Sequence, residues 1–157
     1  MDKVKEIEKQ YDRIYRYCYF KLRQREAAED ITQETFLRFL ESETYQNEGK
    51  ALQYFYTVAG NLCIDEYRKA GRRKEDPGGK EPEERSDERS LEDQLVCSIA
   101  LKEALEQLEE RDRELLLLRY VNEVPVSVLC SLYQMSRFAI YRRLKQILKS
   151  LREKLES

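Results

Sequence analysis

The fold of the C-terminal part is decided by residues 122–155, NEVPVSVLCSLYQMSRFAIYRRLKQILKSLREKL. Pro125 suits the first turn of a helix, where its missing N–H group leaves no hydrogen bond unmade, and this helix is expected to run to about Tyr133. Residues 134–135 then form a short turn, and the hydroxyl of Ser136 is expected to cap a second helix. The sequence therefore predicts two helices joined by a tight turn.

The second of these helices has two chemically different faces. Helical spacing predicts an apolar face formed by Ile140, Leu144, Ile147, Leu148, Leu151 and Leu155. The opposite face carries Phe138, Tyr141, Arg142, Lys145, Lys149 and Arg152. A tight turn followed by a helix with a cationic outer face is typical of a DNA-binding helix-turn-helix. The alternative is an amphipathic terminal helix with ordinary surface lysines, but the turn spacing and the cap favour the first interpretation.

Charge is distributed unevenly along the chain. The net charge of −2 alone argues against nucleic acid, but residues 68–74, RKAGRRK, hold five cations, and residues 137–154 hold seven cations against one acid. Between these patches, residues 75–93 carry nine acids against three cations, with two of the three prolines. A segment so poor in apolar side chains cannot bury surface and is predicted to be a flexible linker. Local basic patches, rather than the net charge, govern affinity for DNA.

The N-terminal half predicts three helices, over residues 3–22, 27–41 and 51–70, with a loop over residues 42–50. The predicted core faces of these helices are, in chain order, Val4, Ile7, Tyr11, Ile14, Tyr15, Cys18 and Leu22; Ala28, Ile31, Thr35 and Phe39; and Leu52, Phe55, Ala59, Leu62 and Cys63.

Two further helices are predicted over residues 95–109 and 111–121, and the four consecutive leucines of the second indicate burial on most sides. The predicted fold class is therefore all-α. Two small helical domains, residues 1–74 and 94–157, are joined by a flexible acidic linker, residues 75–93, and the second is a four-helix domain with a C-terminal helix-turn-helix.

Two further stripes of side chains lie off the predicted core faces of the first domain. The second helix carries Asp30, Gln33, Glu34 and Leu37 at helical spacing. The third carries Tyr54, Val58, Asn61, Asp65, Arg68 and Arg72. This third stripe begins aromatic and polar and ends cationic, a mixture that suits nucleic acid because rings stack on bases and cations bind phosphate. An ordinary solvated face running into a basic tail is the alternative.

Composition excludes several classes of protein. The 157 residues suit one domain or two small ones, and five glycines with three prolines argue against a sandwich or barrel. The absence of histidine excludes a Ser-His-Asp site and histidine-ligated zinc. No catalytic residue, metal or cofactor is expected. The four cysteines lack C-x-x-C spacing and are interpreted as buried thiols in a reducing cytoplasm. Neither a targeting signal nor an apolar run long enough to insert into a membrane is recognised.

Four segments, in order, resemble motifs of one family: AEDITQETFLRFL (residues 28–40), YFYTVAGNLCIDEYRKAGRRK (54–74), LEERDRELLLLRY (108–120) and, more loosely, the helix-turn-helix. The chain resembles an extracytoplasmic-function (ECF) sigma factor of the sigma-70 family, over about residues 7–155. The resemblance implies an RNA polymerase sigma factor with a region 2-like and a region 4-like domain. Such a protein performs no chemistry of its own but confers promoter specificity and assists promoter melting.

The resemblance also assigns roles to residues. Binding to the β′ subunit of core polymerase would involve Asp30, Gln33, Glu34, Phe36 and Leu37, with Phe36 packed beneath the others. Binding to the −10 element, including capture of a flipped base, would involve Tyr45, Asn47, Lys50, Tyr54, Asn61, Asp65, Arg68, Arg72 and Arg73. Binding to the −35 element would involve Ser136, Arg137, Phe138, Tyr141, Arg142, Lys145 and Lys149.

The implied partners are core RNA polymerase (β′ and β subunits), promoter DNA and an anti-sigma factor. The free protein is expected to be a cytoplasmic monomer.

Several positions depart from the family pattern. Tyr54 stands where tryptophan is usual, and Gly60 is expected to loosen its helix because glycine costs about 1 kcal/mol in a helix interior. Gln134 replaces the turn glycine, Phe138 replaces the glycine after the cap, and Arg142 replaces a small hydroxyl residue. These departures indicate an unusual −35 sequence or a divergent branch, such as that of some clostridial toxin-gene sigma factors.

Three rival functions explain less of the sequence. A helix-turn-helix transcription regulator that does not bind core polymerase leaves the AEDITQETF segment unexplained. A helical enzyme with Glu29, Asp30 and Glu34 as metal ligands lacks the histidines that such bundles use. A pure adaptor that binds a partner through its helices overlaps with the anti-sigma partner expected of the family.

Overall fold

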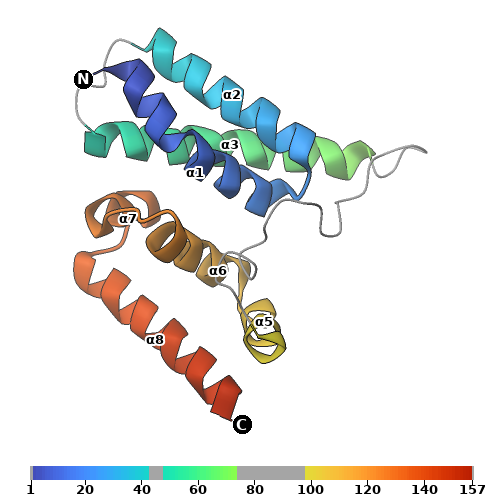
Figure 1. Cartoon of the computed structure of the whole chain (residues 1–157), viewed down its shortest axis with the longest axis vertical. Helices are drawn as coiled ribbons and strands as arrows, with labels where there is room; N and C mark the ends of the chain where they lie inside the picture. The colour runs from blue at the N-terminus through green and yellow to red at the C-terminus, as the bar shows by residue number, and fades with distance from the viewer. Residues whose placement is uncertain (1, 43–47, 74–97, 157) are drawn as a thin grey trace. The chain divides into compact units, whose positions relative to one another are not determined.

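The computed structural model describes residues 2–42, 48–73 and 98–156, and the chain divides into two compact units, Met1–Ser86 and Asp87–Ser157. Among the described residues every regular element is a helix, as the all-α prediction requires (Figure 1). The predicted linker over residues 75–93 lies outside the described part of the chain, as does Cys97. None of the described helices is both long enough and apolar enough to cross a membrane.

The first unit is a bundle of α1 (Lys3–Leu22), α2 (Arg25–Glu41) and α3 (Glu48–Arg73), in which each helix contacts the other two. The three predicted helices are thus confirmed, with shifted ends. The predicted loop over residues 42–50 is wrong at its C-terminal end, because α3 already begins at Glu48. The α3 helix also continues beyond the predicted residue 70, to Arg73.

Local signals explain where α1 begins and ends. The carboxylate of Asp2 accepts hydrogen bonds from the backbone N–H groups of Val4 (3.0 Å) and Lys5 (3.2 Å), which otherwise lack helical partners. Arg23 ends the helix in the left-handed region, with φ 56°, and its N–H group donates to the carbonyl of Tyr19 at 2.8 Å. This cap reverses the chain within two residues, so that α2 returns beside α1.

Aromatic rings form the centre of the first unit. The centre of the Phe55 ring lies 4.6 Å from the centre of the Phe39 ring and 4.9 Å from that of the Phe36 ring. Both pairs have edge-to-face geometry. The ring of Tyr11 stacks on the outer side of Phe36 at 5.7 Å. These contacts tie α1, α2 and α3 together through α2, whose predicted core residues Ala28, Ile31, Thr35 and Phe39 are all buried.

Other predicted core positions are less uniform. Phe55, Ala59 and Cys63 of α3 are buried as predicted, whereas Leu52 and Leu62 are only half-buried. The prediction is wrong for Val4, whose side chain is 58% exposed because it lies in the first turn of α1. Tyr56 is buried although it was not on the predicted face, and its ring meets that of Tyr17 edge-on at 5.3 Å.

Gly60 lies where α3 passes close to α1. A Cβ atom at this position would stand 3.1 Å from the hydroxyl oxygen of Tyr17, which is tighter than an ordinary contact. The α3 helix continues unbroken through Gly60, so the expected loosening of the helix is not observed. The missing side chain instead makes room for a tyrosine of the neighbouring helix.

The second unit contains α5 (Ile99–Glu106), α6 (Glu110–Leu116), η1 (Leu117–Val121), α7 (Val126–Tyr133) and α8 (Arg137–Glu156). The long helix α8 contacts α5, α6 and α7, and the interior is aliphatic rather than aromatic. The helix predicted over residues 95–109 is shorter than expected, since Ser98 caps it and it ends at Glu106.

The helix predicted over residues 111–121 changes its winding midway. After Leu116 the chain follows a π-helical turn, in which the N–H group of Asn122 donates to the carbonyl of Leu117 at 2.9 Å. All four consecutive leucines, residues 115–118, are at most 3% exposed, which confirms the prediction that this segment is buried on most sides. The π-helical turn itself was not predicted from the sequence.

Candidate nucleic-acid and partner interfaces

The turn between α7 and α8 forms without glycine. Gln134 adopts a left-handed conformation, with φ 53° and ψ 47°, which costs an ordinary residue roughly 1–2 kcal/mol. The N–H group of Met135 donates to the carbonyl of Cys130 at 3.1 Å, and the hydroxyl of Ser136 accepts from the N–H group of Ala139 at 3.0 Å. The predicted cap and turn are therefore confirmed, and the Ser136 hydroxyl is engaged in starting α8.

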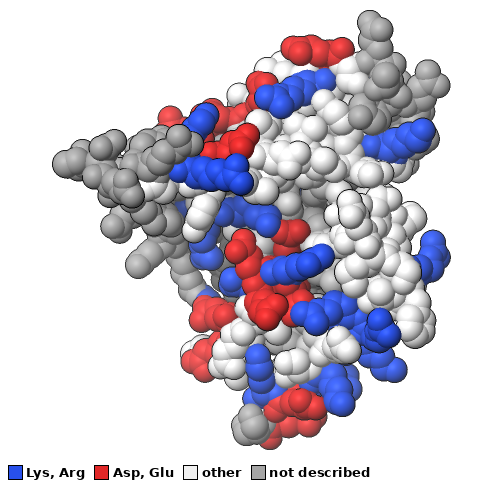
Figure 2. Space-filling model, turned by 180° about the vertical axis from the view of Figure 1, so that it is seen from behind, with Lys and Arg blue, Asp and Glu red and all other residues white. Residues whose placement is uncertain are grey.

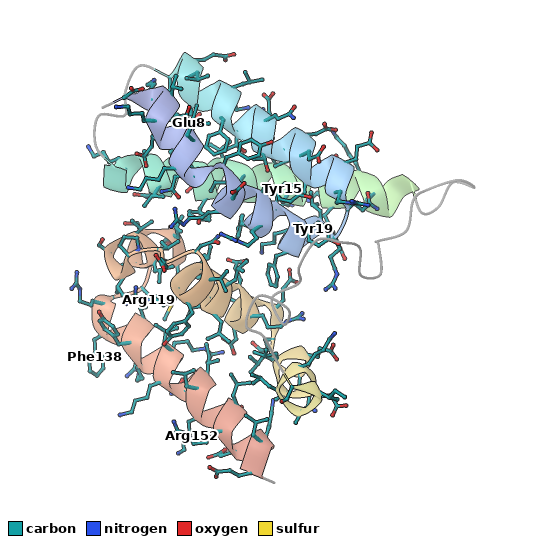
Figure 3. All side chains as sticks on the ribbon, in the orientation of Figure 1. Glu8, Tyr15, Tyr19, Arg119, Phe138 and Arg152 are labelled. Carbon is teal, nitrogen blue, oxygen red and sulfur yellow. The ribbon has the colours of Figure 1, made fainter. Side chains whose placement is uncertain are left out.

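The face of α8 opposite the core carries the side chains predicted to contact the −35 element. Phe138 is 72% exposed and Tyr141 is 49% exposed. The cations Arg137, Arg142, Lys145, Lys149 and Arg152 are all exposed on the same helix. Phe138 and Arg152 point away from the rest of the second unit (Figure 3). Lys and Arg side chains spread over the lower part of the face drawn in Figure 2, beside acidic side chains.

The inner face of α8 differs in part from the prediction. Ile140, Leu144, Ile147 and Leu151 are buried as predicted. The prediction is wrong for Leu148 and Leu155, which are 42% and 45% exposed because the neighbouring short helices cover only a narrow stripe of α8. The outer face of α8 therefore has apolar positions as well as cations.

Arg143 fixes the orientation of α8. Its guanidinium group donates to both carboxylate oxygens of Asp112 in α6, with Nε–Oδ1 2.9 Å and Nη2–Oδ2 2.8 Å. The Asp112 side chain is only 12% exposed, so this two-bond pair satisfies a largely buried carboxylate. Sequence analysis counted Arg143 among the cations of the basic run, but in the structure its guanidinium group is bound to Asp112 of α6.

Phe138 and Arg142 contact each other on the exposed face. The guanidinium carbon of Arg142 lies 5.1 Å from the centre of the Phe138 ring, a cation–π distance across one helical turn. Both residues are departures from the family pattern identified in the sequence. The structure shows that the two departures form one pair.

The second surface lies on α2. Asp30, Gln33, Glu34 and Leu37 follow one another at helical spacing, and all four are exposed. Glu34 forms an ion pair with Arg38 of the next turn, with an Nε–Oε1 distance of 2.9 Å. Phe36 is only 4% exposed, so it lies in the aromatic core beneath this surface and cannot itself touch a partner without rearrangement.

A neighbouring leucine extends this surface and was missed from the sequence. Leu37 is 52% exposed, and Leu40, one turn further along α2, is 46% exposed. Large apolar side chains among acids and amides are typical of a protein interface rather than of a nucleic-acid interface. The three-residue spacing from Leu37 to Leu40 is the signal that could have found it.

The predicted −10 residues are spread over two parts of α3. Lys50 is in the first turn of the helix rather than in a loop, and Tyr54 is half-buried with its ring 6.0 Å from that of Phe39. Asn61, Asp65 and Arg68 are exposed further along α3. Tyr45 and Asn47 lie outside the described residues, and Arg72 and Arg73 are described only as backbone of the last turn of α3.

Two exposed side chains of α3 were also missed. Ile64 is 51% exposed and Tyr67 is 68% exposed, and they lie beside the stripe of Asn61, Asp65 and Arg68. An exposed aromatic ring beside amides and cations can stack on a base. The i, i+3 spacing of the two residues places them on adjacent turns of the same face.

Within the described ranges no group of three or more Cys, Asp or Glu side chains is placed to hold a metal ion. The carboxylates Glu29, Asp30 and Glu34 of α2, considered as metal ligands in the sequence, are all exposed.

Comparison with known proteins identifies the first unit. Residues 7–73, which span most of α1 and all of α2 and α3, match the family described as Sigma-70 region 2. Over 121 residues, 74% of this chain, the sequence is 32% identical to the ECF RNA polymerase sigma factor BldN of Streptomyces coelicolor. Over most of its length the chain is similar to the ECF sigma factors. A second relative, the ECF RNA polymerase sigma factor SigW of Bacillus subtilis, is 39% identical over 59 residues, or 37% of this chain.

The matched segments span 46% of BldN and 32% of SigW, so this chain spans about half the length of the first relative and a third of the second. Among solved structures, it resembles the sigma factor RpoE in its co-crystal with the anti-sigma factor NepR from Bartonella quintana, with a TM-score of 0.62 at 18% identity over 98% of this chain and 96% of that one. At this identity the likeness establishes the fold, and it agrees with the predicted all-α sigma factor fold.

Proposed function

We propose that this protein binds core RNA polymerase, directs it to promoters by recognising −10 and −35 elements, and assists promoter melting. The observation that carries the proposal is the Sigma-70 region 2 match over residues 7–73, because it covers the helix that exposes the acidic and amide surface. As in the family, the polymerase would perform the chemistry and this protein would supply the specificity.

The α2 surface suits a protein partner. Asp30 and Gln33 offer a carboxylate and an amide to a basic surface, such as the β′ coiled coil expected from the family. Leu37 and Leu40 add exposed apolar area, which supplies affinity when it is buried at an interface. The ion pair between Glu34 and Arg38 holds Glu34 partly neutralised, so we expect it to contribute less than Asp30.

The exposed stripe of α3 suits single-stranded DNA at the −10 element. Asn61 can read a base edge, Arg68 can hold a phosphate, and Tyr67 can stack on an unpaired base. Tyr45, Asn47, Lys50, Asp65, Arg72 and Arg73 stay in this proposal on the resemblance to the family. Tyr54 packs beside Phe39, so we propose that it supports the melted strand from a partly buried position.

The outer face of α8 suits the major groove of duplex DNA. An arginine can donate two hydrogen bonds to guanine, and lysines near the end of a recognition helix hold phosphates. We therefore assign Arg137, Phe138, Tyr141, Arg142 and Lys145 to the bases of the −35 element and Lys149 to the backbone. The Ser136 hydroxyl caps α8, so its proposed contribution is to position these residues.

An anti-sigma factor is a further proposed partner. The RpoE structure that shares this fold was solved as a complex with the anti-sigma factor NepR. A regulator that covers the exposed surfaces of α2 and α8 would block polymerase and promoter together.

A second candidate is a helix-turn-helix regulator that does not bind polymerase. The exposed cationic face of α8 alone would support it. Binding to core polymerase separates the two functions, because only the sigma proposal requires the α2 surface.

The test is run-off transcription from a library of genomic fragments, with core polymerase in the presence and absence of this protein. Discrete new start sites that share a spaced two-part upstream motif are the expected result. A chain that binds an upstream motif but neither binds core polymerase nor produces starts would be the regulator. A chain that does none of these would end both proposals.

Single substitutions test whether the surfaces of α2 and α8 bind as proposed. Leu37→Ala is expected to weaken core binding, while Val4→Ala, which removes a similarly exposed apolar side chain from α1, is not. Arg142→Ala is expected to relax base preference at one −35 position by about 1–3 kcal/mol. A uniform loss over all promoter sequences would instead make Arg142 a phosphate contact.

A further inference from the structure

We propose that Phe138 and Arg142 act as one reading unit that recognises a guanine with a thymine in the neighbouring base pair. Arg142 donates to the guanine, and Phe138 both orients Arg142 and contacts the thymine methyl group. The inference rests on the proposed contact of α8 with duplex DNA and adds to it the bases that are read and the residue that positions the arginine.

The exposure of Phe138 is the first observation. The ring is 72% exposed in the first turn of α8, on the side that faces away from the rest of the second unit (Figure 3). Its position in the fold therefore contributes little to the core, unlike the buried Ile140 two residues later. An aromatic ring presented beside cations at the start of a recognition helix is placed to meet base edges.

The contact of Arg142 with this ring is the second observation. The guanidinium carbon lies 5.1 Å from the ring centre, which is a cation–π distance. A guanidinium held in this way can still direct two parallel N–H groups to O6 and N7 of a guanine. A free arginine loses rotamer freedom when it binds a base, and the contact with the ring removes part of this cost in advance.

Arg143, the next residue, provides an internal contrast. The Nε and Nη2 groups on one edge of its guanidinium donate to the carboxylate of Asp112, at 2.9 and 2.8 Å. This anchor fixes the rotation of α8 about its own axis, and thereby fixes the direction in which Arg142 leaves the helix. The two adjacent arginines thus have different partners: Arg143 binds Asp112 of α6, and Arg142 contacts the exposed ring of Phe138.

The identity of the second base follows from the size of the pair. Stacked base pairs are about 3.4 Å apart. A ring whose centre lies 5.1 Å from the guanidinium carbon of Arg142 can therefore reach the base pair next to the one that Arg142 contacts. A phenyl ring has no hydrogen-bonding group, and the apolar group that the major groove offers is the thymine methyl. The pair therefore fits a step that contains one guanine and one thymine.

The experiment begins with selection of duplex DNA from a random library by the full chain, alone at low salt and with core polymerase. The −35 half of the selected motif is expected to contain the guanine–thymine step. Single atoms are then removed from that step. Replacing guanine by 7-deazaguanine is expected to lower affinity by about 5-fold to 150-fold, and replacing thymine by uracil, which removes only the methyl group, by about fourfold.

Variants assign each loss to a residue. Phe138→Ala is expected to abolish the effect of the uracil replacement and also to reduce the preference for guanine, whereas Phe138→Tyr, which keeps the ring, retains both. Arg142→Ala is expected to abolish the effect of 7-deazaguanine alone. Tyr120→Ala, which removes a ring of the second unit that is 49% exposed and belongs to none of the proposed binding surfaces, is the matched control and is expected to leave the response to both analogues unchanged.

Each failure has a distinct meaning. A motif without the guanine–thymine step, or a Phe138→Ala variant whose guanine preference equals that of the unaltered protein, would overturn the reading unit while leaving −35 binding intact. A chain that selects no sequence in either format would overturn both this inference and the proposed −35 contact. Selection of the motif without core binding would overturn only the polymerase part of the proposed function.

Discussion

The two units of this protein orient their exposed helices by different means. In the first unit, α2 is fixed by aromatic rings, with Phe36 and Phe39 both meeting Phe55 edge-on. In the second, α8 is fixed by aliphatic side chains and by the two-bond ion pair of Arg143 with Asp112. Ring contacts depend on shape and burial, whereas the ion pair adds a direction that leucines alone would not supply.

The difference matters because the two helices have different proposed partners. A protein surface can adapt to small rotations of α2 through side-chain changes, which are common at interfaces. A base pair presents fixed donors and acceptors, so α8 must present its arginine in a narrow range of orientations. The more directional contact lies under the helix that we propose to read bases.

Removing the Phe55 ring tests whether the aromatic contacts hold the first unit together. Phe55→Ala is expected to lower the free energy of unfolding of the first unit by about 3–5 kcal/mol, because a fully buried ring leaves a cavity between the three helices. Hydrogen exchange followed by mass spectrometry measures α1–α3 separately from α8. The control Phe138→Ala removes an exposed ring and should leave exchange in both units nearly unchanged; equal losses in the two variants would contradict the aromatic core.

Removing the ion pair of Arg143 with Asp112 tests how much this pair stabilises the second unit. Arg143→Leu is expected to destabilise the second unit by about 2 kcal/mol, less than a fully buried pair would cost, because the arginine side chain is 42% exposed. The same hydrogen-exchange measurement on α8 checks this value.

The double variant Asp112→Leu with Arg143→Leu separates the contribution of the ion pair to stability from its contribution to the orientation of α8. It should recover much of the lost stability, since no carboxylate is then left buried and unpaired. If the double variant is stable but has lost its base preference, direction rather than stability is what the pair contributes. An unchanged base preference would argue against that role.

Removing the cap of α8 should have a smaller effect. Ser136→Ala is expected to destabilise the second unit by about 1 kcal/mol, because the N–H group of Ala139 loses its partner. The urea midpoint of the helical circular dichroism signal measures the loss. Ser136→Asp restores an acceptor and should recover stability; a Ser136→Asp variant as unstable as Ser136→Ala would show that the hydroxyl does not act as a cap.

Gly60 and Gly71 of α3 give the smallest and most local prediction. Gly71→Ala meets open space and should stabilise α3 by about 0.5 kcal/mol through the higher helix propensity of alanine. Gly60→Ala should give less than this or a loss, because its Cβ would press on the Tyr17 hydroxyl at 3.1 Å. Thermal unfolding of both variants checks the order, and a larger gain at Gly60 would show that Tyr17 moves aside freely.

Prediction from the sequence succeeded where the controlling interactions are local. The cap at Ser136, the turn at Gln134 and the opposite faces of α8 all depend on residues within a few positions of each other. The exposed stripe of α2 follows in the same way from helical spacing. The exposed face of α8 was therefore predicted almost completely from the sequence, and its contact with a −35 element stays a proposal.

Tertiary contacts decided the rest. The sequence determined the helices, their order and their two-faced patterns, because periodicity and capping act within one or two turns. Only the fold commits Arg143 to Asp112, thirty-one residues away, and leaves its neighbour Arg142 on the ring of Phe138. Gly60 likewise acquires its role only when Tyr17 of another helix approaches it. A cation at the surface of one helix and a cation bound to a second helix look alike in sequence, since the partner that distinguishes them is distant along the chain.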